Sequence, residues 1–152
     1  MKLRFFHDTD LTDISKIESS SFTVGAYSLM MLKSMIYSNS SFTIVIEENN
    51  KIIGYGTAAK LNKKSMDIES IAILPEYQGK GYGSKLIEAV EDEIKKRNYK
   101  TAVLEVREKN ENAKNFYLNH GYKIVDFIEN YYLLEFNKSR NAYRMEKDLQ
   151  II

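Results

Sequence analysis

A cluster of glycines between a strand-like segment and a helix-like segment constrains this fold most strongly. Gly79, Gly81 and Gly83 are three of the chain's seven glycines and fall within five residues. They follow an apolar run that stops at Pro75, the only proline, and they precede apolar residues at helical spacing over residues 83–97. Glycine lets the backbone approach a ligand closely, and a helix N-terminus presents unpaired N–H groups to an anion. The segment therefore predicts a loop that holds a phosphate or pyrophosphate.

Two common phosphate-binding loops do not match this spacing. A P-loop needs Gly, four residues and then Gly-Lys-Ser/Thr, which the segment lacks. A dinucleotide-binding loop needs G-x-G-x-x-G directly after a strand, with an acidic residue about 20 positions further on. Glu105 falls near that distance, but the third glycine comes one residue early and residues 75–78 separate strand from loop. The alternative to a phosphate-binding loop is a plain glycine-rich connector between strand and helix, which would bind no ligand.

Hydrophobic periodicity places this loop in a mixed sheet with helices. Alternating segments predict strands, apolar spacing of three and four residues predicts helices, and Asn49-Asn50 predicts a hairpin turn. The predicted strands are 2–6, 42–47, 52–59, 67–74, 101–106, 122–127 and 142–149, and the predicted helices lie around 14–21 and over 27–37, 83–97 and 110–119. An early hairpin followed by β-α-β-α-β order predicts an α/β fold with a mixed sheet.

Composition limits the class of protein further. The chain has 152 residues, 43% of them hydrophobic, and a net charge of +1, so we expect one domain over residues 1–152 and no preference for nucleic acid. It has no cysteine, and only His7 and His120 as imidazoles, so we expect neither a thiolate nucleophile nor a multi-histidine metal site. The charged N-terminus and the lack of a run of about 20 apolar residues predict a cytoplasmic protein without a membrane segment.

A longer motif around the glycines resembles a known family. The segment IAILPEYQGKGYGSKL, residues 71–86, resembles the acetyl-coenzyme A signature of the GCN5-related N-acetyltransferase (GNAT) superfamily. That signature runs from an apolar strand through Gln/Arg-x-x-Gly-x-Gly/Ala into a helix. A second family element follows, with Asn110, Ala113, Tyr117 and Gly121-Tyr122. The resemblance covers nearly the whole chain and implies a mixed, mostly antiparallel sheet of about seven strands flanked by about four helices.

The resemblance also implies acetyl-coenzyme A as the cofactor. The residues implied in its binding are Ile71, Ala72, Ile73, Gln78, Gly79, Lys80, Gly81, Tyr82, Gly83, Ser84, Asn110, Ala113 and Tyr117. In the family the loop amides hold the pyrophosphate, and the strand before the loop pairs its backbone with the pantetheine arm. Ordinary core packing also explains Ile71 and Ile73, and an N-cap also explains Asn110. Lys80 and Lys85 would add positive charge beside the pyrophosphate.

Glu105 and Tyr117 are the candidate catalytic residues. Without cysteine or a Ser–His pair, direct transfer in a ternary complex is favoured over a covalent acyl-enzyme. The stretch LEVR around Glu105 resembles the ribosomal-protein-alanine N-acetyltransferase branch, which implies a general base; a solvent-facing strand position is the alternative. Resemblance makes Tyr117 the acid that protonates the departing thiolate, with packing on a helix face as the alternative. Asp67 and Glu69, expected on the same strand face as Ile71, are the reserve bases.

Four aromatic residues are the candidate substrate contacts. Tyr131 and Tyr132 resemble the paired tyrosines that line the peptide site of protein N-terminal acetyltransferases, although core or dimer packing also explains them. Phe22 and Tyr27 stand where relatives carry an aromatic loop, whose proline is missing here. These residues predict acetyl transfer to a protein N-terminal α-amino group, a ribosomal protein among the candidates, by a monomer or homodimer. The alternatives are a small-molecule amine acetyltransferase, acting on polyamines or antibiotics, and a non-catalytic acyl-coenzyme A sensor.

Overall fold

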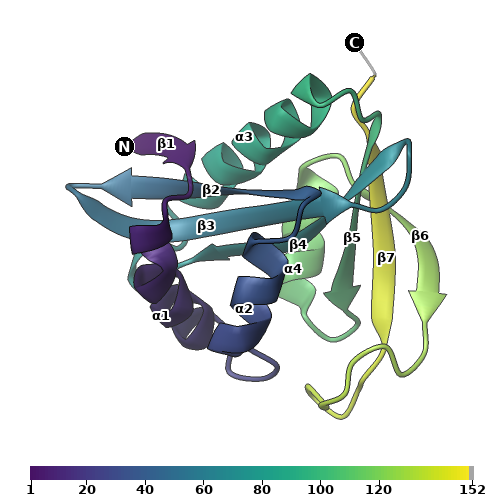
Figure 1. The fold of residues 1–152 in the computed structure, drawn as a ribbon. Helices are drawn as coiled ribbons and strands as arrows, with labels where there is room; N and C mark the ends of the chain where they lie inside the picture. The colour runs from purple at the N-terminus through teal and green to yellow at the C-terminus, as the bar shows by residue number, and fades with distance from the viewer. Residues whose placement is uncertain (151–152) are drawn as a thin grey trace.

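A seven-stranded mixed sheet forms the centre of the structure, a computed structural model that describes residues 1–150 (Figure 1). The strands are β1 (Lys2–Phe5), β2 (Ser41–Glu48), β3 (Lys51–Lys60), β4 (Ser65–Ile73), β5 (Thr101–Arg107), β6 (Lys123–Ile128) and β7 (Ala142–Asp148). The helices are α1 (Leu11–Ser21), α2 (Leu29–Ile36), α3 (Tyr82–Lys96) and α4 (Glu111–Asn119), with short 3-10 turns at Asp8–Asp10 and Pro75–Tyr77. The sheet order is β1-β2-β3-β4-β5-β7-β6, and only β4 and β5 pair in parallel.

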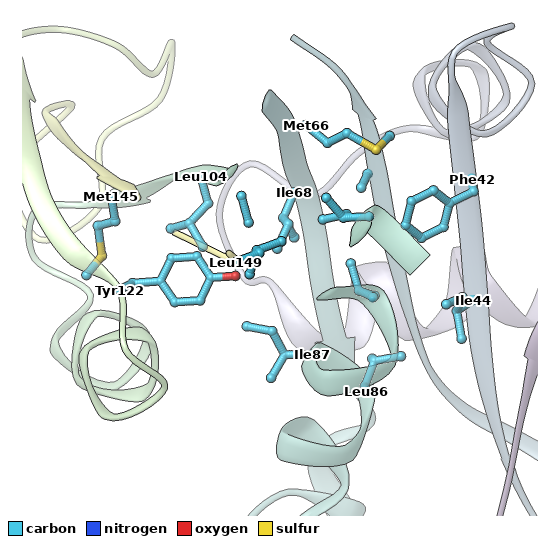
Figure 2. Close-up of a cluster of buried hydrophobic side chains, with 14 of the residues drawn as sticks. Phe42, Ile44, Met66, Ile68, Leu86, Ile87, Leu104, Tyr122, Met145 and Leu149 are labelled. Atoms are coloured by element: carbon cyan, nitrogen blue, oxygen red, sulfur yellow. The ribbon is translucent and has the colours of Figure 1, made fainter. Parts of the chain in front are cut away.

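The helices cover both faces of this sheet (Figure 1). Ile14 and Ile17 of α1 and Leu32 of α2 are buried against Tyr55 of β3 on one face. On the other face α3 buries Leu86, Ile87, Val90 and Ile94, a stripe spaced by three and four residues as its periodicity predicts. Figure 2 shows Leu86 and Ile87 beside side chains from β2, β4 and β5. The predicted fold class, a mixed sheet with four flanking helices, is confirmed.

The parallel pair β4–β5 opens in the middle of the sheet. The two strands are in register at Ser65 with Thr101, Met66 with Ala102 and Asp67 with Val103, and the pairing ends there. Beyond Asp67, β4 continues along β3 while β5 continues along β7. The separation leaves one edge of each strand without a partner strand, and both cavities described below lie along these edges.

A β-bulge reverses the side-chain alternation of β4. Ala58 of β3 pairs with Ile68 and Thr57 pairs with Ser70, so Glu69 is the extra residue. As a result Ile71 packs in the same core cluster as Ile68, on the α3 side. The expectation that Asp67, Glu69 and Ile71 share one strand face is therefore wrong, because a simple period of two does not continue through a bulge.

No helix within residues 1–150 is long and apolar enough to cross a membrane.

Candidate active site

The glycine loop and the first turn of α3 form a backbone cradle. Gly79 and Gly81 have φ of +75° and +88°, and Gly81 is the N-cap residue of α3. A Cβ added at either glycine would have no protein atom within 4 Å, so each borders open space. The first N–H groups of a helix have no partner within the helix. The loop therefore offers N–H donors to an anion. A side chain at either glycine would project into the open space beside these donors.

A cavity of about 580 Å³ extends from this cradle along β4 and α4. Its lining includes the predicted residues Ile71, Ala72, Ile73, Gln78, Gly79, Gly81, Gly83, Ser84, Asn110, Ala113 and Tyr117, together with Ser21, Phe22, Asn112 and Phe116. We refer to it as the groove. The position of the groove beside the glycine loop suits an elongated ligand whose anionic part binds at the N-terminus of α3.

Two of the predicted coenzyme contacts do not turn their side chains into the groove. The Tyr82 hydroxyl donates to Glu48 Oε2 at 2.8 Å, and Lys80 Nζ lies 5.7 Å from the ring centroid of Tyr77. Neither residue lines the groove, nor does the exposed Lys85. The side chains of Lys80 and Tyr82 thus have other partners in this structure, and their part in coenzyme binding stays a prediction.

The free edge of β4 supplies further backbone groups to the groove. Leu74 N–H donates to Ile53 O at 2.8 Å, so alternation turns the backbone groups of Ile71 and Ile73 away from β3. The carbonyl of Ile73 already accepts from Gln78 Nε2 at 2.8 Å and from Ser21 Oγ at 3.1 Å. The groups of Ile71 and the N–H of Ile73 therefore remain for a ligand. The isoleucine side chains pack in the core, which confirms the packing interpretation, and their backbone contact with the coenzyme stays a prediction.

A second cavity of about 300 Å³ opens between β4 and β5. Its walls include Glu69 and Ile71 of β4, Glu105 to Arg107 of β5, the loop after α1, and Tyr132 and Phe136. It shares Ser21, Phe22, Ile71, Asn110, Ala113 and Tyr117 with the groove. The two cavities therefore meet at these residues, and we call the second one the acceptor cavity.

Glu18, Glu69 and Glu105 line the acceptor cavity, and Asp67 lies beside Glu105. The Glu105 side chain is only 9% exposed, so it does not face solvent, and its Oε2 accepts from Arg144 Nε at 3.0 Å. Burial, together with the neighbouring Glu105, raises the pKa of Asp67 to about 8. Burial and the charge of Glu105 also raise the pKa of Glu69. The raised pKa favours a protonated Asp67 near neutral pH, while Arg144 forms the ion pair with Glu105.

Tyr117 lies where the two cavities meet. Burial raises the pKa of its hydroxyl well above the ordinary value, so the group stays protonated and can donate.

Asn110 caps α4, since its Oδ1 accepts from Ala113 N–H at 3.1 Å, which confirms the N-cap interpretation. His120, the residue after α4, places Nδ1 2.7 Å from Phe116 O and Nε2 2.9 Å from Ser84 Oγ. The expectation that the chain has no Ser–His pair is therefore wrong, because these residues lie 36 positions apart in the sequence. The pair joins α4 to the first turn of α3.

The aromatic candidates surround the acceptor cavity. Phe22 and Tyr27 line it from the loop after α1, and the Tyr27 hydroxyl donates to Glu69 O at 3.3 Å. Tyr132 lines it from the other side, and the Tyr131 hydroxyl donates to Glu105 Oε1 at 3.4 Å. Burial in the core, one of the alternatives for the paired tyrosines, does not apply to Tyr131, which is 45% exposed.

The structure adds a buried acid that our sequence interpretation missed. Glu18 of α1 is 1% exposed; its Oε1 accepts from the Tyr55 hydroxyl and its Oε2 accepts from Tyr27 N–H at 2.9 Å. Burial raises its pKa. Glu18 thereby fixes the loop that carries Tyr27. The signal was present in the sequence, because Glu18 continues the buried helical stripe of Ile14 and Ile17.

Comparisons with known proteins agree with this geometry. The sequence matches the model of the acetyltransferase (GNAT) family over residues 11–122. It is 39% identical over 85 residues to the ribosomal protein bS18-alanine N-acetyltransferase of Haemophilus influenzae, a match covering 56% of this chain and 57% of that protein, less than two thirds of its length. The fold is similar to the ribosomal-protein-S18-alanine N-acetyltransferase from Escherichia coli, with a TM-score of 0.88 at 24% identity over 99% of this chain and 95% of that one. It is also similar to Arabidopsis thaliana Naa50 in complex with the bisubstrate analogue CoA-Ac-MVNAL, with a TM-score of 0.81 at 25% identity over 97% of each chain.

The chain belongs to the GNAT family of acetyltransferases. Enzymes of this family use acetyl-coenzyme A, so the predicted family and cofactor are both confirmed. The residues of the groove fit that molecule. A Cβ-free cradle at the start of a helix suits the pyrophosphate, the unpaired backbone of β4 suits the amides of the pantetheine arm, and the groove leads to Tyr117 and the acceptor cavity.

Proposed function

We propose that this protein acetylates the N-terminal α-amino group of a protein, with a ribosomal protein as the leading candidate. The observation that carries the proposal is the acceptor cavity, where Glu105 is held by Arg144 and lies beside the paired tyrosines. Relatives support it, because one acts on the alanine of ribosomal protein bS18 and another binds a bisubstrate analogue of coenzyme A and a peptide.

The residues of the acceptor cavity suit an α-amine. Such an amine has a pKa of about 7.7–8.0, so part of it is already neutral near pH 7 and the base has a modest task. Glu105 is the base in this proposal, since its side chain is buried at the cavity and Arg144 fixes its orientation. A lysine side chain, with a pKa near 10.4, would ask more of the same base.

Tyr117 is the proposed acid. When bound, acetyl-coenzyme A supplies the acetyl group as a thioester. Tyr117 lines both cavities and keeps its proton, so its hydroxyl can donate to a thiolate formed where they meet. Ser84, Asn110, Ala113 and the glycine loop are the proposed contacts of the coenzyme, and Phe22, Tyr27, Tyr131 and Tyr132 those of the acceptor.

The test compares three kinds of acceptor under identical conditions. The purified protein is incubated with acetyl-coenzyme A and peptides with a free N-terminus, the same peptides blocked at the N-terminus but carrying lysine, and spermidine. Mass spectrometry then locates the acetyl group. We expect modification of the free α-amine and little of the blocked peptides. Acetylation of spermidine alone would overturn the proposal in favour of a small-molecule enzyme.

A further inference from the structure

Arg107, the last residue of β5, contacts both loops that enclose the acceptor cavity. Its Nη1 donates to Leu134 O at 2.8 Å, and its Cζ lies 3.9 Å from the ring centroid of Tyr132. On the other side, a Cβ added to Gly25 would lie 2.8 Å from Arg107 Nη2. The guanidinium group therefore lies between residues 22–27 and residues 132–136, which we call the two acceptor loops.

The loop at 132–136 is held at its two ends, since Phe136 and Ser139 also exchange two backbone hydrogen bonds, whereas its tip is exposed. Tyr132 and Arg140 exchange two hydrogen bonds at its base, from Tyr132 N–H to Arg140 O and from Arg140 Nε to Tyr132 O. At the tip Leu133 is 91% exposed and Leu134 is 58% exposed, so apolar burial contributes little there. The hydrogen bond from Arg107 to Leu134 O and the stacking on Tyr132 therefore connect this tip to the sheet.

The opposite loop requires a glycine at the contact. Gly25 has φ of +74°, and any side chain there would meet the guanidinium group. The backbone of this loop thus passes directly against Arg107, four residues after Ser21, the last residue of α1. Glu18 fixes the same loop from the α1 side through Tyr27 N–H. The loop is thus fixed through Tyr27 and lies against Arg107 at Gly25.

We propose that Arg107 is a positioning residue that clasps the two acceptor loops and so shapes the acceptor cavity. The planar guanidinium group stacks on an aromatic ring and donates in its own plane at the same time, which a lysine ammonium group does not reproduce. Arg107 lines the acceptor cavity and is absent from the lining of the groove. Its loss should therefore weaken use of the acceptor and leave use of acetyl-coenzyme A unchanged. The kinetic part of this inference rests on the proposed function.

The test uses Arg107→Lys and Arg107→Ala, with Arg97→Lys as the matched control. Arg97 likewise lies over an aromatic ring, Phe42, at 4.7 Å and donates to Glu93 at 2.8 Å, but it lies at the end of α3, away from both cavities. For both Arg107 variants we expect the KM of the peptide to rise by about tenfold or more, the equivalent of about 1.4 kcal/mol. The KM of acetyl-coenzyme A should stay within about twofold of the wild type for all three variants.

Hydrogen exchange followed by mass spectrometry gives a readout that needs no acceptor. In Arg107→Ala, exchange should accelerate in peptides covering residues 22–28 and in those covering 129–141, while peptides from α3 and β3 keep the wild-type rate. Added guanidinium ion should restore part of the peptide KM in Arg107→Ala, and ammonium ion should not.

The outcomes separate the two proposals. If the wild-type protein acetylates no peptide, the proposed function is refuted. Hydrogen exchange of Arg107→Ala in the two acceptor loops then still tests the clasp. A wild-type protein that acetylates peptides, with Arg107→Lys unchanged in KM, refutes the clasp. Faster exchange confined to one loop, or spread over the whole chain, refutes it as well.

Discussion

Substitution of Gly81 by alanine tests the cradle most directly, because Gly121 offers a matched control. Both glycines have the same left-handed backbone, with φ of +88° and +90°. A residue with a Cβ in this conformation costs roughly 1–2 kcal/mol. For a domain of this size each kcal/mol lowers Tm by about 2–4 °C. We therefore expect Gly81→Ala and Gly121→Ala to lose similar stability by thermal unfolding.

The two variants should differ in their use of acetyl-coenzyme A. A Cβ at position 81 has no protein atom within 4 Å and projects into the space proposed for the pyrophosphate. At position 121 it would meet only the flexible end of Lys147, with Cε at 3.3 Å. Hydrogen bonds to a charged group contribute about 1.5–3 kcal/mol each. Loss of one in Gly81→Ala should raise the KM of acetyl-coenzyme A by roughly 10- to 100-fold.

The assay is steady-state kinetics with acetyl-coenzyme A varied at saturating peptide, with calorimetric titration of coenzyme A as a second measurement. Gly121→Ala should retain the wild-type KM and Kd. Equal affinity in both variants, alongside equal loss of stability, would show that the pyrophosphate does not lie at this loop.

Three further predictions concern the acids. Glu105→Gln should lower kcat by about 10²–10⁴, the usual contribution of a general base, with the Kd of coenzyme A unchanged by calorimetry; an unchanged kcat would move the role to Asp67 or Glu69. The folded state holds the proton of Asp67 up to about pH 8 while the unfolded state releases it near pH 4, so this residue lowers stability increasingly as pH rises between those values. Asp67→Asn should therefore raise Tm more at pH 8 than at pH 5, and an equal gain at both would contradict the raised pKa. Glu18→Gln replaces one of two accepting oxygens with a donor and should cost about 1–3 kcal/mol in chemical denaturation, with a higher KM for the peptide but not for acetyl-coenzyme A.

Local sequence patterns were sufficient to predict most of the fold. Seven alternating segments became strands and four periodic segments became helices, because burial of one face requires a matching period. Pro75 does follow the end of β4, and the glycine cluster does lead into α3. These features depend on neighbours within a few residues, which is the range over which a sequence pattern is informative.

Contacts between residues far apart in the chain could not be predicted from the sequence. The hydrogen bond of Tyr82 is made to Glu48, which lies 34 residues earlier, so the motif alone gave no reason to expect it. Likewise, Arg107 binds Leu134, which lies 27 residues later in a segment without a regular period. No spacing rule along one strand or helix could reveal such pairs.

The bulge at Glu69 explains why three acids can share one small region. Without the extra residue, a period of two would place Ile71 on the face of Asp67 and direct it away from the core cluster of Ile68. With it, the strand keeps Ile68 and Ile71 in the core and still offers Asp67 and Glu69 to the opening beside β5. Glu105 reaches the same opening because β5 leaves β4 after Asp67 and pairs with β7, whose Arg144 lies opposite Glu105 in register. Like charges so close repel, and the raised pKa of Asp67 and the ion pair of Glu105 with Arg144 both reduce this cost. The end of the β4–β5 pairing, the bulge and the pairing with β7 thus together place Glu69 and Glu105 at the acceptor cavity and Arg144 beside Glu105.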